Sequence, residues 1–387
     1  MKKVAVLPLR AGSKGIVGKN KKKLLGRPLY QWVLTEAVFS NLDKIYVFSD
    51  DDEILDFIGK EYNWSSKVIG IRRSTSSATD TASTEAAMIE VAEKINYDFD
   101  IFCLLQATSP LTNSEDINRC LDKVENTDYD SALTVVETKR FLWSASGESQ
   151  NYDYTNRPRR QDFNGVLVEN GAVYACQKEV FIENKNRLGG RIGVVKMRED
   201  TLIEIDEPSD WLIMESLMEN RLFQFKKPSK KIKAIVFDVD GVFTDSTVAV
   251  SSSGELFKSF SLRDGMGFEF LKQENIIPII MTSEDSLIVK KRMEKLQLEH
   301  VHLGVKDKYS RVQTVLNQLG LTRNELAYLG DDINDLSNLS SVGWGVCPID
   351  AEEEVKRVSD LVMTKEGGKK VVRELISTVI KINRKYN

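Results

Sequence analysis

Short apolar runs alternate with amphipathic stretches through the first half of the chain. Three runs have the length and continuity of buried strands: residues 4–7, 44–48 and 101–105. Three longer stretches repeat apolar residues at helical spacing: residues 29–39, 53–62 and 84–95. Strands that alternate with helices in this way predict a parallel sheet with helical crossovers. The first half is therefore predicted to be an α/β domain.

The same alternation returns in the second half. Apolar runs predict three more strands, at residues 234–239, 276–281 and 326–329. Helical spacing predicts helices between and after them, at residues 286–296, 310–319 and 368–382. With 387 residues the chain exceeds the size at which one core usually keeps growing, so two doubly wound α/β domains are expected.

A basic segment, KKPSKKIK, separates the two patterns. It is too short to fold and too charged to bury, which is typical of a linker. We expect a first domain over residues 1–226, a linker over 227–232 and a second domain over 233–387.

Charge and composition exclude several classes of function. The 54 Lys and Arg nearly balance the 58 Asp and Glu, so the chain lacks the broad basic field that non-specific nucleic-acid binding requires. The apolar run after Lys2 and Lys3 is too short for a signal peptide, and no later run approaches the length of a membrane span. We therefore expect neither nucleic-acid nor membrane partners, and we expect a cytoplasmic location.

Histidine and cysteine offer little chemistry. The four cysteines lack a CxxC spacing and are interpreted as buried, reduced thiols. The two histidines, His300 and His302, are too few for a His-based metal centre. Catalysis is therefore expected to depend on carboxylates, lysines and arginines.

Two acidic motifs in the second half follow predicted strands. DVDGVFTD begins with Asp238 and Asp240 directly after one strand, and GDDIND places Asp331 after another. The carboxyl ends of parallel strands form the usual ligand-binding edge of an open sheet. A loop after Asp238 would bring both of its carboxylates and the Val239 carbonyl around one hard cation, with Asp331 adding a further oxygen ligand. A magnesium site is expected there.

With these motifs, the second half from about Lys233 resembles the haloacid dehalogenase superfamily, and within it the cap-less 3-deoxy-octulosonate 8-phosphate phosphatases. The resemblance implies a Rossmann-like domain in which Asp238 is the nucleophile and Asp240 the general acid and base. It implies that Asp331 is the third magnesium ligand, with Asp335 in support.

Further residues follow from the same resemblance. Thr282 and Lys308 would hold phosphoryl oxygens, with Lys306 an alternative to Lys308, and Arg263 would contact a sugar-acid carboxylate. The sequence after Thr282 departs from the family's Thr-Gly-Arg because it carries an acidic residue, Glu284. The segment around Gly367, Gly368, Lys369 and Lys370 either begins a helix or approaches the site of a neighbouring subunit.

The first predicted strand leads into a loop rich in glycine, lysine and amide donors. It is not a P-loop, because the G-x-x-x-x-G-K-[ST] order is absent. Backbone amides and cations of this kind suit a triphosphate. The candidate nucleotide-binding residues of the loop are Arg10, Gly12, Ser13, Lys14, Lys19 and Asn20.

Seven segments in order resemble acylneuraminate cytidylyltransferases over about residues 1–221: LPLRAGSKGIVGKN, FSDDDEI, RRSTSSATDTAS, LLQATSPLT, RPRRQDF, NGAVYA and IEIDEPSDW. The resemblance implies a nucleotidyltransferase-like sheet, catalytic Arg10 and Lys19, and CTP contacts that also include Asn20, Arg73 and Thr84. It implies that six residues face the sugar acid: Gln106, Thr108, Ser109, Arg159, Asn170 and Tyr174. A second magnesium ion would bind Asp206 and Glu204, the latter standing where the family more often has aspartate.

Together these motifs predict a bifunctional enzyme. Its second domain would dephosphorylate a nonulosonate 9-phosphate, and its first would couple the freed acid to CTP with magnesium in both sites. A cytidylyltransferase with a non-catalytic assembly or regulatory module is the alternative. The sugar acid stays open between N-acetylneuraminate, its deaminated analogue, legionaminate and an octulosonate. Both resemblances imply a homo-oligomer, and a homotetramer is expected.

Overall fold

The computed structural model describes residues 1–12, 15–79, 81–224, 231–252 and 254–386. The chain forms two compact units, Met1–Lys23 with Pro28–Glu215, and Leu24–Arg27 with Ser216–Asn387. Most of the expected linker, residues 227–232, lies outside the described residues. Each unit is built around its own sheet with helices on both faces, as the strand and helix pattern predicts.

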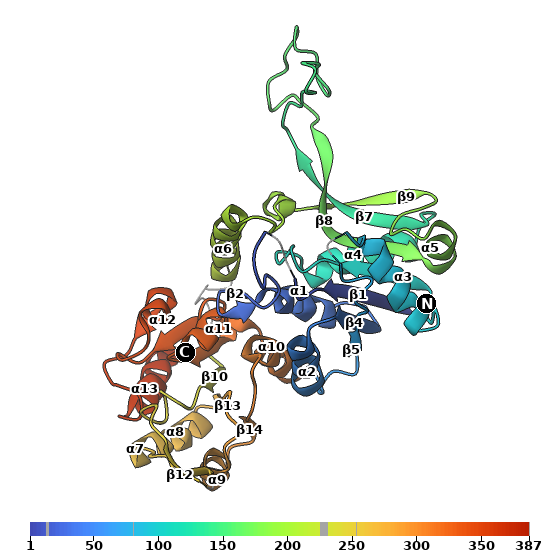
Figure 1. Cartoon of the computed structure of the whole chain (residues 1–387). Coiled ribbons are helices and arrows are strands. Elements are labelled where there is room, and N and C mark those ends of the chain that lie inside the picture. The colour runs from blue at the N-terminus through green and yellow to red at the C-terminus, as the bar shows by residue number, and fades with distance from the viewer. Residues whose placement is uncertain (13–14, 80, 225–230, 253, 387) are drawn as a thin grey trace. The chain divides into compact units, whose positions relative to one another are not determined.

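The sheet of the first unit has the strand order β5-β4-β1-β6-β8-β7-β9 (Figure 1). The strands are β1 Lys3–Leu9, β4 Lys44–Ser49, β5 Val68–Arg72, β6 Ile101–Leu105, β7 Ser131–Thr138, β8 Val166–Gln177 and β9 Ile192–Met197. The first four pair in parallel, as expected, but β8 runs antiparallel to both β6 and β7. The sheet is therefore mixed rather than purely parallel.

Alternating side chains of the central strand assign the helices to the two faces. Ala5 and Leu7 of β1 pack with one set of helices, whereas Val4 and Val6 pack with the other. The first set is α1 Leu29–Val38, α2 Asp52–Glu61 and α4 Ser114–Glu125, and the second is α3 Thr84–Lys94 and α5 Lys178–Asn184. The remaining elements are β2 Lys23–Leu24, β3 Arg27–Pro28, η1 Glu199–Leu202 and α6 Pro208–Phe223.

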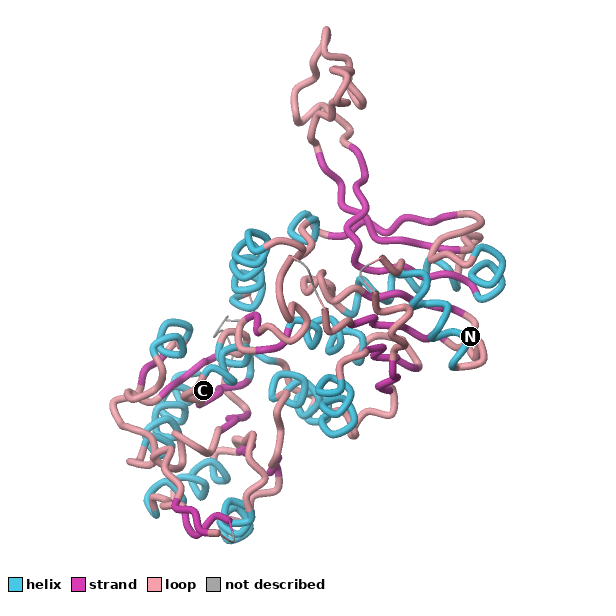
Figure 2. Tube along the Cα trace, in the orientation of Figure 1, coloured by secondary structure: helices cyan, strands magenta, loops and turns pink. Residues whose placement is uncertain are grey.

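A long arm leaves the first sheet where β7 and β8 continue beyond it. Figures 1 and 2 show the two strands running away from the sheet into a loop at the tip. Aromatic rings pack on one another there, with the ring centroids of Phe141 and Tyr152 4.2 Å apart. Trp143 remains half exposed. The sequence pattern did not predict this arm.

The second unit contains a six-stranded sheet of order β14-β13-β10-β15-β16-β17, in which every neighbouring pair is parallel. Its strands are β10 Ala234–Phe237, β13 Ile277–Met281, β14 His300–His302, β15 Leu326–Leu329, β16 Trp344–Cys347 and β17 Leu361–Val362. A separate hairpin, β11 Ala249–Ser251 and β12 Gly254–Phe257, follows the first strand.

Helices cover both faces of this second sheet. One set is α8 Gly267–Gln273, α9 Leu287–Lys295 and α13 Val371–Asn383, and the other is α10 Lys308–Leu319, α11 Leu336–Leu339 and α12 Glu353–Val358. Short elements complete the unit: α7 Leu262–Gly265, η2 Arg323–Glu325, η3 Ile333–Asp335 and η4 Arg384–Tyr386. The four cysteines of the chain are buried free thiols. A search of the described residues finds no helix of the length and apolar character that crossing a membrane requires.

His302 predicts how acid affects the second unit. Burial, together with the charge of Arg311, lowers the pKa of its imidazole to about 4. The folded state then binds fewer protons than the unfolded state below about pH 6.5, so the free energy of unfolding falls as the pH drops from there to about 4. We expect the urea midpoint of His302→Gln to fall less steeply over this range than that of the wild type, with His300→Gln as the control. Equal slopes for the two variants would contradict this.

Candidate active sites

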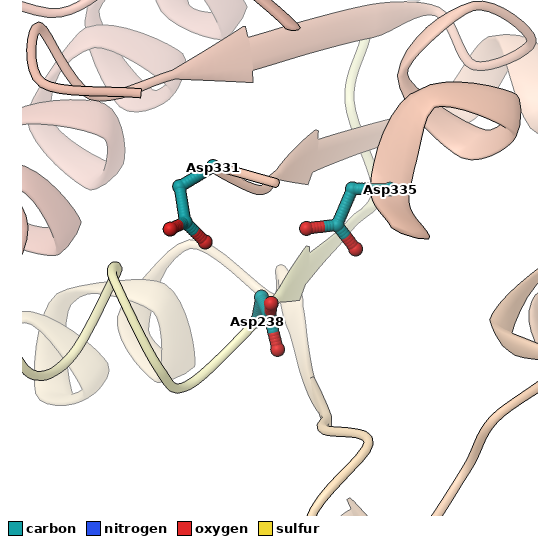
Figure 3. A group of neighbouring side chains, drawn as sticks. All are labelled: Asp238, Asp331 and Asp335. Carbon is teal, nitrogen blue, oxygen red and sulfur yellow. The ribbon is translucent and has the colours of Figure 1, made fainter. Parts of the chain in front are cut away.

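Three carboxylates meet at the carboxyl edge of the second sheet. Asp238 follows β10, and Asp331 and Asp335 lie in the loop and short helix after the neighbouring strand β15. Carboxylate oxygens of the three lie within 4.8 Å of one another (Figure 3). The backbone N–H of Asp238 donates to the carbonyl of Leu329 at 2.9 Å, which ties the two strand ends together.

One buried cation faces this group. Lys308 begins α10, and its ammonium lies 2.8 Å from Asp238 Oδ2 and 2.9 Å from Asp335 Oδ1. Burial alone would lower the pKa of Lys308, but the charges of Asp238 and Asp335 outweigh it and raise the pKa. The Tyr328 hydroxyl donates to the same Asp335 oxygen at 2.6 Å. Lys308 is therefore a paired, buried cation rather than a solvated helix-start lysine.

The three carboxylates fit a divalent cation. Burial, followed by the charges of Asp238 and Asp335, raises the pKa of Asp331 to about 9, and burial raises that of Asp238 to about 7. Asp331 Oδ1 and Asp335 Oδ2 are buried and have no hydrogen-bond partner within the part of the chain that the structure describes. Oxygen ligands that repel one another and lack other partners suit a hard ion such as Mg²⁺.

The expected ligand set of Asp238, Val239, Asp240 and Asp331 shares Asp238 and Asp331 with this cluster. The carboxylate of Asp240 turns to the ammonium of Lys258, at 2.7 Å, and Asp335 takes its place among the clustered oxygens. The Val239 carbonyl accepts backbone N–H groups of the following turn, the shortest from Phe243 at 2.8 Å. Asp240 and the Val239 carbonyl are thus both paired with other groups of the domain.

The other expected residues of this site lie at different depths. Thr282 directly follows β13 and is buried, and its hydroxyl accepts the N–H of Glu284 at 3.2 Å. Glu284 itself is exposed and pairs with Lys306 at 3.2 Å. The structure thus brings Lys308, and not Lys306, to the carboxylates. Arg263 lies exposed in α7.

Two glycines allow close backbone packing around the loop of residues 238–245, which we call the nucleophile loop because Asp238 is the expected nucleophile. Gly241 has a φ of +78°, and a Cβ there would lie 1.8 Å from Asp331 Oδ2. A Cβ on Gly367 would lie 2.2 Å from the carbonyl oxygen of Gly241. Gly368 donates its N–H to the Val242 carbonyl at 2.9 Å. The Gly-Gly segment therefore packs on the loop of its own domain, and α13 begins only at Val371.

Gly241→Ala is expected to disturb the carboxylate cluster without unfolding the chain. The added methyl group would displace Asp331, and a misplacement of about 1 Å costs about 10²-fold in rate. We expect phosphate release to fall by that order and the rise in melting temperature on adding Mg²⁺ to disappear. Gly59→Ala, where a Cβ meets nothing within 4 Å, is the control. An unchanged Mg²⁺ response in Gly241→Ala would contradict the prediction.

The first unit contains a polar cavity of about 560 Å³ at the carboxyl ends of β1 and β6. The loop after β1, the start of α3 and the segment before α6 all contribute to its wall. Nine residues expected to bind the nucleotide, the sugar acid or a metal line this one cavity: Arg10, Lys19, Asn20, Arg73, Thr84, Gln106, Thr108, Glu204 and Asp206.

Opposite charges lie close together in the cavity wall. Lys19 Nζ lies 3.1 Å from Asp206 Oδ1 and donates to the Ile205 carbonyl at 2.7 Å. Glu204 Oε2 lies 3.3 Å from the Gln106 amide nitrogen and 3.4 Å from the Thr108 hydroxyl. Burial, followed by the charge of Asp206, raises the pKa of Glu204 to about 7. Both carboxylates line this cavity and offer oxygen ligands of the kind that Mg²⁺ prefers.

Five other expected residues that the structure describes do not line the cavity. Ser109 and Asn170 are buried, and the Asn170 amide donates to the Thr201 carbonyl at 3.2 Å. The Tyr174 hydroxyl donates to Glu169, while Arg159 lies exposed in the arm beyond β7. Gly12 is exposed in the loop, and Ser13 and Lys14 lie outside the described residues.

Sequence reasoning missed two charged residues next to expected ones. Glu90 of α3 accepts the N–H of Ser74 at 3.0 Å and the Ser77 hydroxyl, and so holds the loop that follows Arg73. Lys258 contacts Asp240, as described above. Neither lies in a recognisable motif, because each reaches its partner only through the folded chain.

Comparison with known proteins also divides the chain into two domains. Residues 4–232 match the family model described as Cytidylyltransferase, and residues 286–375 match the model described as haloacid dehalogenase-like hydrolase. The N-acylneuraminate cytidylyltransferase of Oncorhynchus mykiss is 30% identical over 394 residues, which cover 98% of this chain and 89% of that protein.

The second half has relatives of its own. The 3-deoxy-D-manno-octulosonate 8-phosphate phosphatase KdsC of Haemophilus influenzae is 33% identical over 156 residues, covering 40% of this chain and 87% of that protein. A solved structure of this phosphatase from Moraxella catarrhalis, in complex with magnesium, phosphate and a KDO molecule, is 33% identical with a TM-score of 0.39. It covers 43% of this chain and 94% of that one.

The first family model spans more than half of the chain, and the Oncorhynchus mykiss relative matches along nearly all of it. The second model matches a stretch that contains Asp331 and Asp335, two of the three clustered carboxylates. The chain therefore belongs to the cytidylyltransferase family, with a haloacid dehalogenase-like hydrolase domain as its second half.

Proposed function

We propose that the chain is a bifunctional enzyme that removes phosphate from a nonulosonate 9-phosphate and then couples the freed sugar acid to CTP. We assign the second reaction to residues 1–226 and the first to residues 233–387. The main support is that each domain contains the functional groups that one of these reactions needs. The second carries a buried carboxylate beside a lysine, and the first a cavity lined by cations and two carboxylates.

In the phosphatase reaction, Asp238 attacks phosphorus and forms an aspartyl phosphate. The bond from phosphorus to the sugar oxygen breaks, its electron pair stays on that oxygen, and Asp240 supplies the proton. Water then attacks the aspartyl phosphate and gives its proton to Asp240, which releases inorganic phosphate and restores Asp238. Lys308 and Thr282 stabilise the negative charge on the phosphoryl oxygens.

Asp238, Asp331 and Asp335 would hold magnesium in this site. When bound, the ion offsets the repulsion between the nucleophilic carboxylate and the phosphate. The ammonium of Lys308 contributes to the same balance of charge from inside the domain, because it already pairs with two of these carboxylates.

In the transferase reaction, the anomeric hydroxyl of the sugar acid attacks the α-phosphorus of CTP and loses its proton to water. The bond from the α-phosphorus to pyrophosphate breaks, and pyrophosphate leaves with the electron pair. Arg10 and Lys19 face the charge that moves onto pyrophosphate, while Arg73 and Thr84 bind the nucleotide. Gln106 and Thr108 offer neutral donors and acceptors to the sugar acid. Glu204 and Asp206 would hold the second magnesium ion.

The assembly we propose is a homotetramer. Between Asp245 and Thr282 the described residues form a hairpin, two short helices and the strand β13, without a large inserted cap. The hairpin exposes apolar side chains, among them Val250 at 67% and Phe257 at 61% of their surface. Such a patch suits contact with a second copy. Light scattering checks this, and a monomer with full phosphatase activity would contradict it.

Paired substrate screens test the proposed function. Phosphate release is measured over the 9-phosphates of candidate nonulosonates and over octulosonate 8-phosphate, and pyrophosphate release over the free acids with CTP. We expect one sugar acid to be preferred in both screens. Pyrophosphate release without any phosphate release would instead favour a non-catalytic second domain.

A further inference from the structure

A buried lysine, Lys258, contacts Asp240 in the nucleophile loop. Lys258 directly follows β12, and its side chain is only 3% exposed. Its ammonium lies 2.7 Å from Asp240 Oδ1 and 3.4 Å from Glu255 Oε1. A buried ammonium is costly unless it is paired, so these carboxylates determine where the side chain lies.

The hairpin just before Lys258 is largely exposed. Every residue of β12 is exposed, and Val250 of β11 projects into solvent. Glu255 adds a second attachment, because its Oε2 accepts the hydroxyl of Ser286, the residue that caps α9. Lys258 is therefore fixed between the nucleophile loop and the start of α9.

The contacts on Asp240 are directional. Lys258 and the Thr244 hydroxyl, the latter at 3.5 Å, both reach Oδ1. Side-chain hydrogen bonds and ion pairs to this carboxylate, as far as the described residues show them, converge on that one oxygen. The carboxylate is held by one edge, and its Oδ2 edge is left to exchange a proton.

We propose that Lys258 is a positioning residue that orients Asp240 toward the leaving oxygen of the phosphate ester. This inference rests on the proposed phosphatase function. As the bond from phosphorus to the sugar oxygen breaks, the proton on Asp240 passes to that oxygen and Asp240 becomes a carboxylate, while Asp238 carries the phosphoryl group. Lys258 stays protonated throughout and compensates the charge that appears on Asp240.

The test compares two leaving groups. A sugar alkoxide needs a proton to leave, whereas p-nitrophenolate does not, so only the sugar phosphate depends on a well-oriented acid in the first step. General acid catalysis contributes about 10²–10⁴-fold. We expect Lys258→Met to lower kcat/KM for the nonulosonate 9-phosphate by about 10²-fold and to leave kcat/KM for p-nitrophenyl phosphate close to wild type.

Controls separate this role from a loss of structure. Lys356→Met removes a partly buried lysine that pairs with Glu353 in α12, and we expect it to leave both substrates unaffected. If Lys258→Met does not fold, Lys258→Gln keeps a hydrogen-bond donor and should show the same selective loss. Melting temperature and cytidylyl transfer are measured alongside.

Each outcome decides one question. A selective loss on the sugar phosphate supports the positioning role. An equal loss on both substrates assigns Lys258 a structural role only, and an unaffected variant gives it none; either result overturns the proposal. A wild-type protein that releases phosphate from neither substrate contradicts the proposed phosphatase function itself.

Discussion

Asp238→Asn is expected to abolish phosphate release while cytidylyl transfer stays close to wild type. An amide cannot form the acyl phosphate, and loss of a covalent nucleophile costs about 10⁴-fold or more. The substitution also removes a charge that pairs with Lys308 at 2.8 Å. Parallel assays of phosphate and pyrophosphate release on the same preparation give both values.

Asp245→Asn is the matched control, because this exposed aspartate lies on the same loop and its carboxylate accepts hydrogen bonds from the nearby Thr247. It should retain phosphate release. If Asp238→Asn lowered cytidylyl transfer as steeply as phosphate release, the assignment of the two reactions to separate sites would be wrong.

Arg10→Ala is expected to produce the opposite result. Arg10 lines the polar cavity of the first domain, where we propose that it faces the triphosphate. Removing one group that stabilises transition-state charge costs about 10²–10³-fold in rate. We expect pyrophosphate release to fall by that factor and phosphate release to stay unchanged.

Arg72→Ala serves as the control for Arg10→Ala. The Arg72 side chain donates to the Asp50 carbonyl at 2.8 Å, pairs with Asp52 and is half exposed outside the cavity lining. Its removal should leave turnover near wild type. Retained CTP turnover in Arg10→Ala would exclude Arg10 from the transferase site.

The strand and helix pattern predicted the elements that carry the carboxylates. Asp238 and Asp331 were expected to meet because each follows a strand of one parallel sheet, and their carboxylates do cluster. The direction of β8 was not predictable in this way. Side chains point alternately to the two faces in parallel and antiparallel strands alike, and β8 takes its direction from pairing with β6 and β7.

The position of Lys258 in the site could not be predicted from local sequence. Its partner Asp240 lies 18 residues earlier, and the two meet only because the hairpin turns back toward the nucleophile loop. Asp240 pairs with Lys258 through this contact and lies outside the group of clustered carboxylates. A motif describes neighbours in sequence, and this pairing depends on tertiary structure.

The contact between Gly367 and Gly241 has a consequence for the order of folding. The nucleophile loop lies near the start of the second domain, yet the backbone that packs against it comes from just before the last long helix. The strand β10 that carries the loop also pairs with β15, formed much later in the chain. Contacts so distant in sequence form slowly, because long loops must close first. During synthesis on the ribosome, we therefore expect the sheet of the first domain to form before the nucleophile loop, whose packing partners are synthesised later.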